Sequence, residues 1–459
     1  MTEVQELARF VVGTHYDQLS TQAAEQLTIR VLDTIGVAIG ALDAEPIVAI
    51  RGLTDSLGGN GASTLIGGGS SAPDRAAFYN TALSRYLDFM DSYLAAGETN
   101  HPSDNLGAVL AAAESVGASG RDFLTALACA YQVHTRLSDV APVRAKGFDH
   151  TVQGAYAVAA GVSRALGLSP EQTANAMAIA GTANNALRVT RTGALSHWKG
   201  LAYPQVAKEG THAALLASVG ITGPAEVFEG NKGFKESIAG DFFIDWSAED
   251  LERVRRTIVK KHNAEIHSQS TIDAAIEIAG TAGFDPSAIR AVRVATFQVA
   301  YDIIGGGEEG DKREVRTKEE ADHSLPYLVA VALLDRQVQP AQYEPARIEA
   351  PDVQQLLALI EVRPDAAYSK RFPDEMPSRV EVELADGTVM GAERAAYHGF
   401  HTDPLDWAGA VEKFNALTTP FTGDALADQL AGVIRELEHR PVSALTDLLG
   451  QVPRDRRLT

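Results

Sequence analysis

Residues 20–42, STQAAEQLTIRVLDTIGVAIGAL, decide how the first half of this 459-residue chain folds. Their apolar side chains recur every three to four positions, which is the period of one face of an α-helix. Ser20 stands directly before this pattern, where its hydroxyl oxygen can accept a hydrogen bond from a backbone N–H of the first turn. The segment therefore predicts a long helix with one buried side.

Further segments of the first half repeat this period and are rich in alanine. Small side chains allow helices to approach closely, so these segments predict a bundle of largely buried helices. They read PDRAAFYNTALSRYLDF, NLGAVLAAAESVGA, RDFLTALACAYQVHTRL, SPEQTANAMAIAGTA and THAALLASVG.

The pattern changes near Arg255. The segment IRAVRVATF alternates apolar and polar residues like a half-buried strand, and RVEVELADGTVM predicts a hairpin around Asp386-Gly387. Helices are expected between them, at EEADHSLPYLVAVALLD and around DVQQLLALI, and again after Pro404. We therefore expect a mainly α protein with an inserted α+β domain. Residues 1–257 form a large helical domain, residues 258–403 a smaller lid domain with a short sheet, and helices of residues 404–459 rejoin the first domain.

The overall charge and the apolar runs exclude several classes of partner. A formal net charge of −20 repels polyanions, so we expect no nucleic acid partner. No apolar run approaches the roughly 18 residues of a membrane-spanning helix. The first residues, MTEVQELARFVVGTHY, lack the basic start and apolar core of a secretory signal, so we expect a cytoplasmic protein.

The chain has a single cysteine, Cys129, within FLTALACAYQVHTRL. Its apolar neighbours predict a small buried side chain. One cysteine cannot form an intrachain disulfide, and it cannot supply the several thiolates that hold an iron–sulfur cluster. We therefore expect no chemistry that depends on such a cluster.

Residues 87–105, LDFMDSYLAAGETNHPSDN, concentrate polar groups at the expected end of a helix. Asp88, Asp91 and Ser92 are expected to close that helix, with Asp88 and Ser92 on one face because they are four positions apart. His101 follows after a short loop. A carboxylate, a hydroxyl and an imidazole brought together are the parts of a proton-transfer site. The alternative is capping and turn chemistry, for which Asp, Ser and Asn are also favoured.

Residues 172–208 contain no acidic side chain, although 60 acidic residues in 459 predict about five in a segment of this length. The same segment contains five basic or titratable residues, Arg188, Arg191, His197, Lys199 and Lys208. A cationic segment in an acidic protein indicates a small anionic ligand, carboxylate or phosphate. The alternative is that these residues pair with acids elsewhere in the fold.

Residues 260–270, KKHNAEIHSQS, combine two lysines, two histidines and a glutamate before an apolar-periodic helix. A helix N-terminus offers free N–H groups and a positive partial charge, both suited to a carboxylate. His262 and His267 are five apart, which misses the i, i+4 spacing of a helical zinc pair, and no third ligand is indicated. We therefore expect no metal here.

These stretches, together with RTGALSHWKGLAYPQVAKEGTHAALLA, GPAEVFEGNKGF and ADHSLPYLVAVALLD, resemble the 2-methylcitrate dehydratase (MmgE/PrpD) family in sequence and order. The resemblance is closer to its 2-methylcitrate dehydratases than to its cis-aconitate decarboxylases. It implies a lyase that acts on a small tricarboxylate without metal or other cofactor, as a homodimer. It also implies an active site between a large helical domain and a smaller lid.

The resemblance also implies roles for individual residues. The catalytic aspartate of the family matches Asp88, and its histidine before Pro-Ser matches His101. Its lysines in the Trp-Lys-Gly element and at the lid entrance match Lys199 and Lys260. An active-site threonine of the family matches Ser92.

Two departures from the family pattern weaken the decarboxylase reading. Decarboxylases have a histidine where this chain has Glu265, with His267 two residues further on. They also have a tyrosine shortly before the ADHS element, and no tyrosine lies between Asp302 and His323 here.

The chemistry of dehydrating 2-methylcitrate, or a close relative such as citrate, assigns tasks to these residues. The substrate carboxylates need cations, for which Lys199 and Lys260 are candidates, with Arg188, Arg191, Ser92 and His267 as further substrate-binding candidates. One group must remove a C–H proton and another must protonate the leaving hydroxyl. Asp88 and His101 are the candidates, and the sequence does not divide the two roles between them.

Three functions remain open at this point. The first is dehydration of a tricarboxylate, and the second is decarboxylation of cis-aconitate or epimerisation of a small polycarboxylate on the same fold. The third is non-catalytic binding of an anion. For His323, the position before an apolar helix favours a structural role at the helix N-terminus over catalysis.

Overall fold

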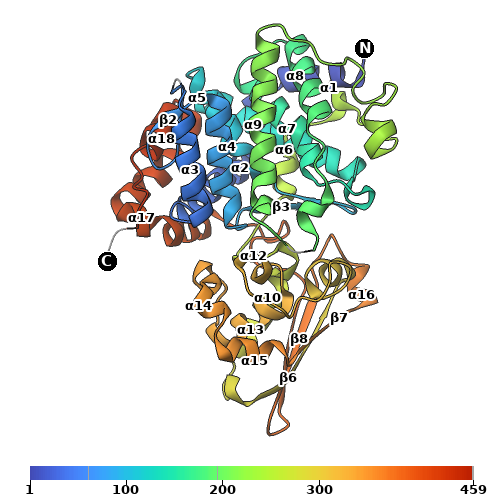
Figure 1. The fold of residues 1–459 in the computed structure, drawn as a ribbon, viewed down its shortest axis with the longest axis vertical. Helices are drawn as coiled ribbons and strands as arrows, with labels where there is room; N and C mark the ends of the chain where they lie inside the picture. Colours follow the sequence, from blue (N-terminus) through green and yellow to red (C-terminus); the bar gives the residue numbers. More distant parts are fainter. Residues whose placement is uncertain (60, 194, 457–459) are drawn as a thin grey trace. The chain divides into compact units, whose positions relative to one another are not determined.

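The computed structural model of the protein describes residues 1–59, 61–193 and 195–456. Ala194 of the RTGALSHWKG element and residues 457–459 of the segment 404–459 lie outside these ranges. The chain forms two compact units (Figure 1). The larger unit consists of Met1–Arg191, His197–Val259 and Leu405–Thr459, and the smaller unit of Thr192–Ser196 and Lys260–Pro404.

The larger unit is built from helices, which confirms the expected mainly α class. They are α1 (Glu3–Gly13), α2 (Thr21–Gly40), α3 (Glu45–Leu57), α4 (Pro73–Tyr86), α5 (Leu106–Ser115), α6 (Gly120–Val140), α7 (Thr151–Ala165), α8 (Pro170–Ala183), α9 (Trp198–Ser218), α17 (Trp407–Arg435) and α18 (Ser443–Leu449).

Helix α2 begins as the sequence predicts, because the hydroxyl oxygen of Ser20 accepts a hydrogen bond from Ala23 N at 3.1 Å. From Ile29 to its end the helix is buried almost continuously. The C-terminal helix α17, red in Figure 1, packs against it, and Phe414 of α17 belongs to the same apolar core. The C-terminal segment therefore completes the core of the larger unit.

Three short strands lie among these helices in the order β4-β3-β5, with antiparallel pairing throughout. They are β3 (Asp91–Leu94), β4 (Thr99–Asn100) and β5 (Ile258–Val259). In the register, Asp91 pairs with Val259 and Ser92 with Ile258. The ladder thus joins the motif of residues 87–105 to the last residues of the larger unit before Lys260. A separate hairpin pairs β1 (Ser63–Thr64) with β2 (Ser70–Ser71).

The smaller unit contains a four-stranded sheet in the order β7-β6-β8-β9. Its strands are β6 (Ile289–Thr296), β7 (Ile360–Pro364), β8 (Ser378–Leu384) and β9 (Val389–Arg394). The strand predicted at IRAVRVATF and the hairpin around Asp386-Gly387 are confirmed as β6 and as β8–β9. Strand β7, which runs parallel to β6, was not predicted, and the helix expected around DVQQLLALI reached only the first residue of this strand, Ile360. That helix, α15 (Pro351–Leu357), ends three residues earlier.

Helices α10 (Gln269–Gly280) and α13 (Leu325–Asp335) pack against this sheet (Figure 1). The side chains of Val380 and Val382 on β8 are buried, whereas Arg293 on β6 is exposed and pairs with Glu383 at 3.1 Å. This alternation is the mark of a strand that is covered on one face. Short helices complete the unit, namely α11 (Gln298–Ala300), α12 (Lys318–Ala321), α14 (Pro345–Ile348) and α16 (Ala366–Ser369).

Two further expectations can be compared with the structure. Cys129 lies buried in α6, as its apolar neighbours predict. Among the helices of the described residues, none is both long enough and apolar enough to span a membrane.

The close approach of α7 and α9 generates the first prediction. A Cβ atom added at Gly154 of α7 would lie 2.5 Å from the ring of Tyr203 on α9. The ring cannot withdraw freely, because its hydroxyl group donates to Asn105 Oδ1 at 3.1 Å. We expect Gly154→Ala to lower the free energy of unfolding by about 1–3 kcal/mol, measured by denaturant titration.

Gly432→Ala is the matched control, because a Cβ atom at this position of α17 meets nothing within 4 Å. Alanine favours a helix over glycine by up to about 1 kcal/mol, so this variant should be at least as stable as the wild-type protein. Equal stability of Gly154→Ala and the wild type would contradict the close helix contact.

Candidate active site

Helix α4 ends at Tyr86, so the prediction that a helix continues to Ser92 is wrong. Asp88 has a φ of 53°, the left-handed region in which a helix cannot continue and which few residues other than glycine adopt. The chain then enters strand β3 at Asp91. Asp88 and Ser92 therefore do not share a helix face, and their side chains are positioned by a turn and a strand.

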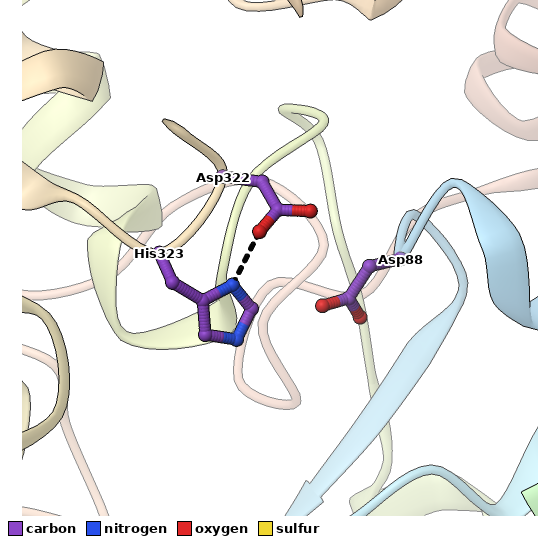
Figure 2. Close-up of side chains that lie close together, drawn as sticks. All are labelled: Asp88, Asp322 and His323. Atoms are coloured by element: carbon purple, nitrogen blue, oxygen red, sulfur yellow. Dashed lines mark hydrogen bonds and ion pairs between the residues drawn. The ribbon is translucent and has the colours of Figure 1, made fainter. Parts of the chain in front are cut away.

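The carboxylate of Asp88, labelled in Figure 2, lies between two cations of the larger unit. Arg85 Nη1 is 2.6 Å from Asp88 Oδ1, and Lys199 Nζ is 3.8 Å from Asp88 Oδ2. The other side of the Arg85 guanidinium faces Asp104, with Nε 3.7 Å from Oδ2. Burial lowers the pKa of Arg85, but Asp88 and Asp104 outweigh it and hold this pKa above its usual value. The geometry favours an ionised Asp88.

His101 is held by the strand that follows Asp88. Its Nδ1 lies 2.8 Å from the carbonyl oxygen of Asp91 and 3.0 Å from Ser92 Oγ. A carbonyl oxygen can only accept, so Nδ1 must have the hydrogen in this arrangement. The ring therefore gains or loses a proton at Nε2, the usual arrangement of an imidazole that acts as acid or base.

Two further histidines, which the sequence did not single out, lie beside this group. The rings of His101 and His150 meet edge to face, with centroids 5.7 Å apart. The ring of Tyr203 has its centroid 6.4 Å from that of His150 and 5.6 Å from that of His134. Burial lowers the pKa of His150 well below its usual value and lowers that of His134 to about 3. Both rings are therefore neutral at pH 7. No spacing pattern in the sequence connects His150 with His101, since only the packing of α7 brings it there.

The cations of the acid-free segment have acidic partners from outside it. Arg191 Nε is 2.8 Å from Asp149 Oδ2, and its Nη1 donates to the backbone oxygen of Lys199 at 2.7 Å. Arg188 Nη1 lies 4.0 Å from the same carboxylate. Burial raises the pKa of Asp149, but Arg191 and its other cationic neighbours hold it below its usual value. Arg191 therefore pairs with an acid from outside the segment, as the alternative interpretation predicted. Its bond to the backbone oxygen of Lys199 holds the first turn of α9.

Two fully buried acids lie beneath these groups. Asp91 Oδ1 accepts from Ser103 N at 3.1 Å, and its Oδ2 is 3.9 Å from Arg30 Nε. Burial raises the pKa of Asp91, and it raises that of Asp104 to about 7 although Arg85 opposes this shift. Asp104 therefore titrates near neutral pH.

In the smaller unit, Lys260 is the residue that follows Val259, and His267 lies in a 3₁₀ turn, Ile266–Ser268. Glu265 holds the imidazole, because its Oε1 is 2.6 Å from His267 Nδ1 and its Oε2 accepts from His267 N at 2.7 Å. Burial raises the pKa of Glu265, but His267 and nearby cations hold it below its usual value. His267 is therefore oriented by a carboxylate.

His262 has a different partner. Its Nε2 is 2.7 Å from Asp273 Oδ1, which also pairs with Lys261 Nζ at 2.8 Å. The two histidines of the KKHNAEIHSQS segment thus bind two separate carboxylates.

The ADHS element interrupts what was expected to be one helix and separates α12 from α13. Ser324 Oγ accepts from Tyr327 N and caps α13. His323, one residue earlier, directs Nδ1 to the carboxylate of Asp322 at 2.5 Å (Figure 2). Asp322 also pairs with Lys318 at 2.7 Å, and its backbone oxygen accepts from Glu265 N at 3.0 Å. The AEIH and ADHS elements therefore lie side by side within the smaller unit.

Comparison with known proteins identifies the family. A model described as the MmgE/PrpD N-terminal domain matches residues 5–247, and one described as the MmgE/PrpD C-terminal domain matches residues 262–439. Together they cover most of the chain, which therefore belongs to the MmgE/PrpD family.

Curated relatives match nearly the full length. The chain is 28% identical to a 2-methylcitrate dehydratase of Cupriavidus necator over 82% of this chain and 81% of that protein. It is 28% identical to the 2-methylcitrate dehydratase of Escherichia coli K12 over 84% and 83%, respectively. A human cis-aconitate decarboxylase is 25% identical over 96% of this chain and 93% of that protein. The family and these relatives define the chain as a lyase.

The buried carboxyl of Asp104 generates a prediction on pH dependence. Its folded-state pKa of about 7 lies above its ordinary value of 3.8, so the folded protein retains a proton that the unfolded chain has lost. This contribution to stability is complete below the ordinary pKa and is lost as the pH rises towards 7. Asp104→Asn cannot titrate. Relative to the wild type, we expect its free energy of unfolding to rise by about 1.4 kcal/mol per pH unit between pH 5 and 7.

Urea denaturation of both proteins at several pH values measures this difference. A difference that stays constant over the whole range would show that the Asp104 carboxyl has an ordinary pKa.

Proposed function

We propose that the protein is a hydro-lyase that dehydrates 2-methylcitrate, or a close tricarboxylate such as citrate, to the corresponding aconitate. The observation that supports this proposal most directly is the Asp88 carboxylate held between Arg85 and Lys199. Three residues further along the chain, the backbone of Asp91 holds His101 with Nδ1 as the donor. A base, an acid and a cation are thus supplied by one part of the larger unit.

The cations around Asp88 support one division of the two roles that the sequence left open. Asp88, beside two cations, starts as a carboxylate, so it can accept a proton but has none to give. We therefore assign to Asp88 the removal of the C–H proton next to a substrate carboxylate. The C–H electron pair becomes the new C=C bond as the C–O bond on the neighbouring carbon breaks. His101, protonated at Nε2, donates to the leaving hydroxyl, which departs as water.

Lys199 has the electrostatic role in this scheme. Removing a proton next to a carboxylate develops further negative charge on that group, and a fixed ammonium stabilises it more in the transition state than in the ground state. Arg191 supports Lys199 through its backbone oxygen and is a positioning residue. Lys260 and Ser92 stay predictions from the family resemblance, as does the homodimer, and Arg188 and His267 stay candidates from the sequence.

The donor set argues for chemistry without an iron–sulfur cluster. Cys129 is the one cysteine of the sequence, its Sγ lies 2.8 Å from Thr14 Oγ1, and burial raises its pKa to about 11. A buried, protonated thiol is a poor iron ligand, and one thiol is too few to hold a cluster.

Decarboxylation of cis-aconitate is the second candidate, because the human relative with that name matches almost the whole chain. The contacts of Glu265 favour dehydration. Where the decarboxylases have a histidine, Glu265 uses both carboxylate oxygens to hold His267. A histidine at this position could not make these two contacts, because it would present at most one acceptor atom.

The function is tested by incubating the purified protein with 2-methylcitrate, citrate and cis-aconitate, before and after prolonged treatment with EDTA. We expect the ultraviolet absorbance of an unsaturated acid to appear from 2-methylcitrate or citrate, and the rate to survive the chelator. Release of CO₂ from cis-aconitate as the main product would support the decarboxylase instead. Activity that is lost with EDTA and restored by a metal would overturn the metal-free scheme.

Asp88→Asn and His101→Ala separate catalysis from capping. Asparagine tolerates the left-handed conformation, so Asp88→Asn should fold normally while losing its base. We expect kcat per folded molecule to fall by about a hundred- to ten-thousand-fold in each variant. The melting temperature of Asp88→Asn should also fall, because the buried Arg85 loses a charged partner.

Asp406→Asn is the matched control, because Asp406 caps α17 by accepting from Gly409 N at 2.8 Å. Asparagine caps nearly as well as aspartate, so both kcat and melting temperature should stay close to wild type. Wild-type turnover in a folded Asp88→Asn protein would show that Asp88 has a structural role, like Asp406, and takes no part in catalysis.

A further inference from the structure

One lysine of the C-terminal helix α17 contacts the loop that contains Asp88. Lys413 Nζ donates to the backbone oxygen of Phe89 at 2.7 Å and pairs with Asp33 Oδ1 of α2 at 2.7 Å. The ammonium also lies over the ring of Phe89, 3.8 Å from its centroid. Two of these contacts are therefore with the residue directly after Asp88.

The surroundings of this lysine are apolar. Ala410, Phe414 and Leu417 of α17 are buried, and the side chains of Lys413 and Asp33 are only 11% and 1% exposed. Removing two charges from water is costly, and replacing such a pair by apolar residues of similar volume is often neutral or stabilising. Fold stability alone therefore gives no strong reason for a lysine at this position.

The backbone of Asp88 gives a more specific reason. A φ of 53° is an unfavourable conformation for an aspartate and needs support from its surroundings. Arg85 binds the carboxylate on one side of this residue, and Lys413 binds the next carbonyl group and the next ring. Together these two cations fix the direction of the chain between α4 and β3.

We propose that Lys413 is a positioning residue, which holds the Phe89 carbonyl so that Asp88 keeps its left-handed backbone and aims its carboxylate for proton removal. This inference rests on the proposed function, in which Asp88 is the base. It gives the C-terminal segment a role in the reaction besides its role in the core.

A pair of variants separates positioning from stability. Lys413→Met removes the bond to Phe89 and leaves Asp33 without its cation, so we expect both the melting temperature and kcat to fall. Asp33→Leu/Lys413→Met also removes the unpaired charge and should regain the melting temperature of the wild type. Its kcat should nevertheless stay about ten- to a hundred-fold below the wild type, with KM changed less than about two-fold, since a misplaced base affects the chemical step.

Lys235→Met is the matched control in the same unit. Lys235 pairs with Glu3 at 2.6 Å and lies 4.7 Å from the centroid of the Phe242 ring, so it makes the same kinds of contact at another place. We expect it to lower the melting temperature while kcat per folded molecule stays at the wild-type value. Circular dichroism supplies the folded fraction for each variant.

The results distinguish this inference from the proposed function. If Asp88→Asn loses turnover but Asp33→Leu/Lys413→Met keeps the wild-type kcat, Lys413 is only a contact between helices and the inference is wrong. If the double variant does not fold, kcat of Lys413→Met per folded molecule decides, with a wild-type value overturning the inference. If Asp88→Asn keeps full turnover, the proposed base itself is wrong.

Discussion

The turn at Asp88 is the constraint on which the candidate site depends. A left-handed residue ends helix α4 at Tyr86 and lets the chain reverse into β3 within four residues. An aspartate in this conformation costs roughly 1–2 kcal/mol. The contact between Arg85 and Asp88 offsets this cost, because the last turn of α4 brings the guanidinium to 2.6 Å from the carboxylate. With an uninterrupted helix, Asp91 could not pair with Val259, and its carbonyl oxygen could not hold His101.

Three arginines of the larger unit pair with buried carboxylates near the candidate site. Arg85 binds Asp88, Arg191 binds Asp149, and Arg30 lies 3.9 Å from Asp91. Burial keeps the rings of His134 and His150, which lie in the same region, neutral. Lys199 lies next to these pairs, with its Nζ 3.8 Å from Asp88 Oδ2, and it is the lysine to which the proposed function gives a substrate carboxylate. Arg188, Arg191 and Lys199 of the acid-free segment all lie near carboxylates from other parts of the chain.

Periodic patterns predicted most of the fold, and contacts between distant segments explain what they missed. The three-to-four spacing in residues 20–42 and the turn at Asp386-Gly387 depend on residues close in sequence. The helix and the hairpin that they predict are both confirmed. The helix expected to reach Ser92 fails because Leu87, Met90 and Tyr93 continue the helical spacing, and apolar spacing does not encode a positive φ. No pattern in the sequence around His150 predicts a place in the site. Its position beside His101 depends on how α7 packs.

The strand pair β3–β5 shows why the candidate residues are spread along the sequence. Arg30 Nη2 donates to the backbone oxygen of Thr257 at 2.8 Å, and its Nε donates to the hydroxyl of the same threonine at 2.9 Å. The same guanidinium faces Asp91, so one arginine of α2 binds both strands of the ladder. The backbone that orients His101 and the backbone that leads to Lys260 are thereby held by a single side chain. A shift of β5 must displace β3 or break these bonds, which couples Ile258 and Val259 to the backbone that holds His101.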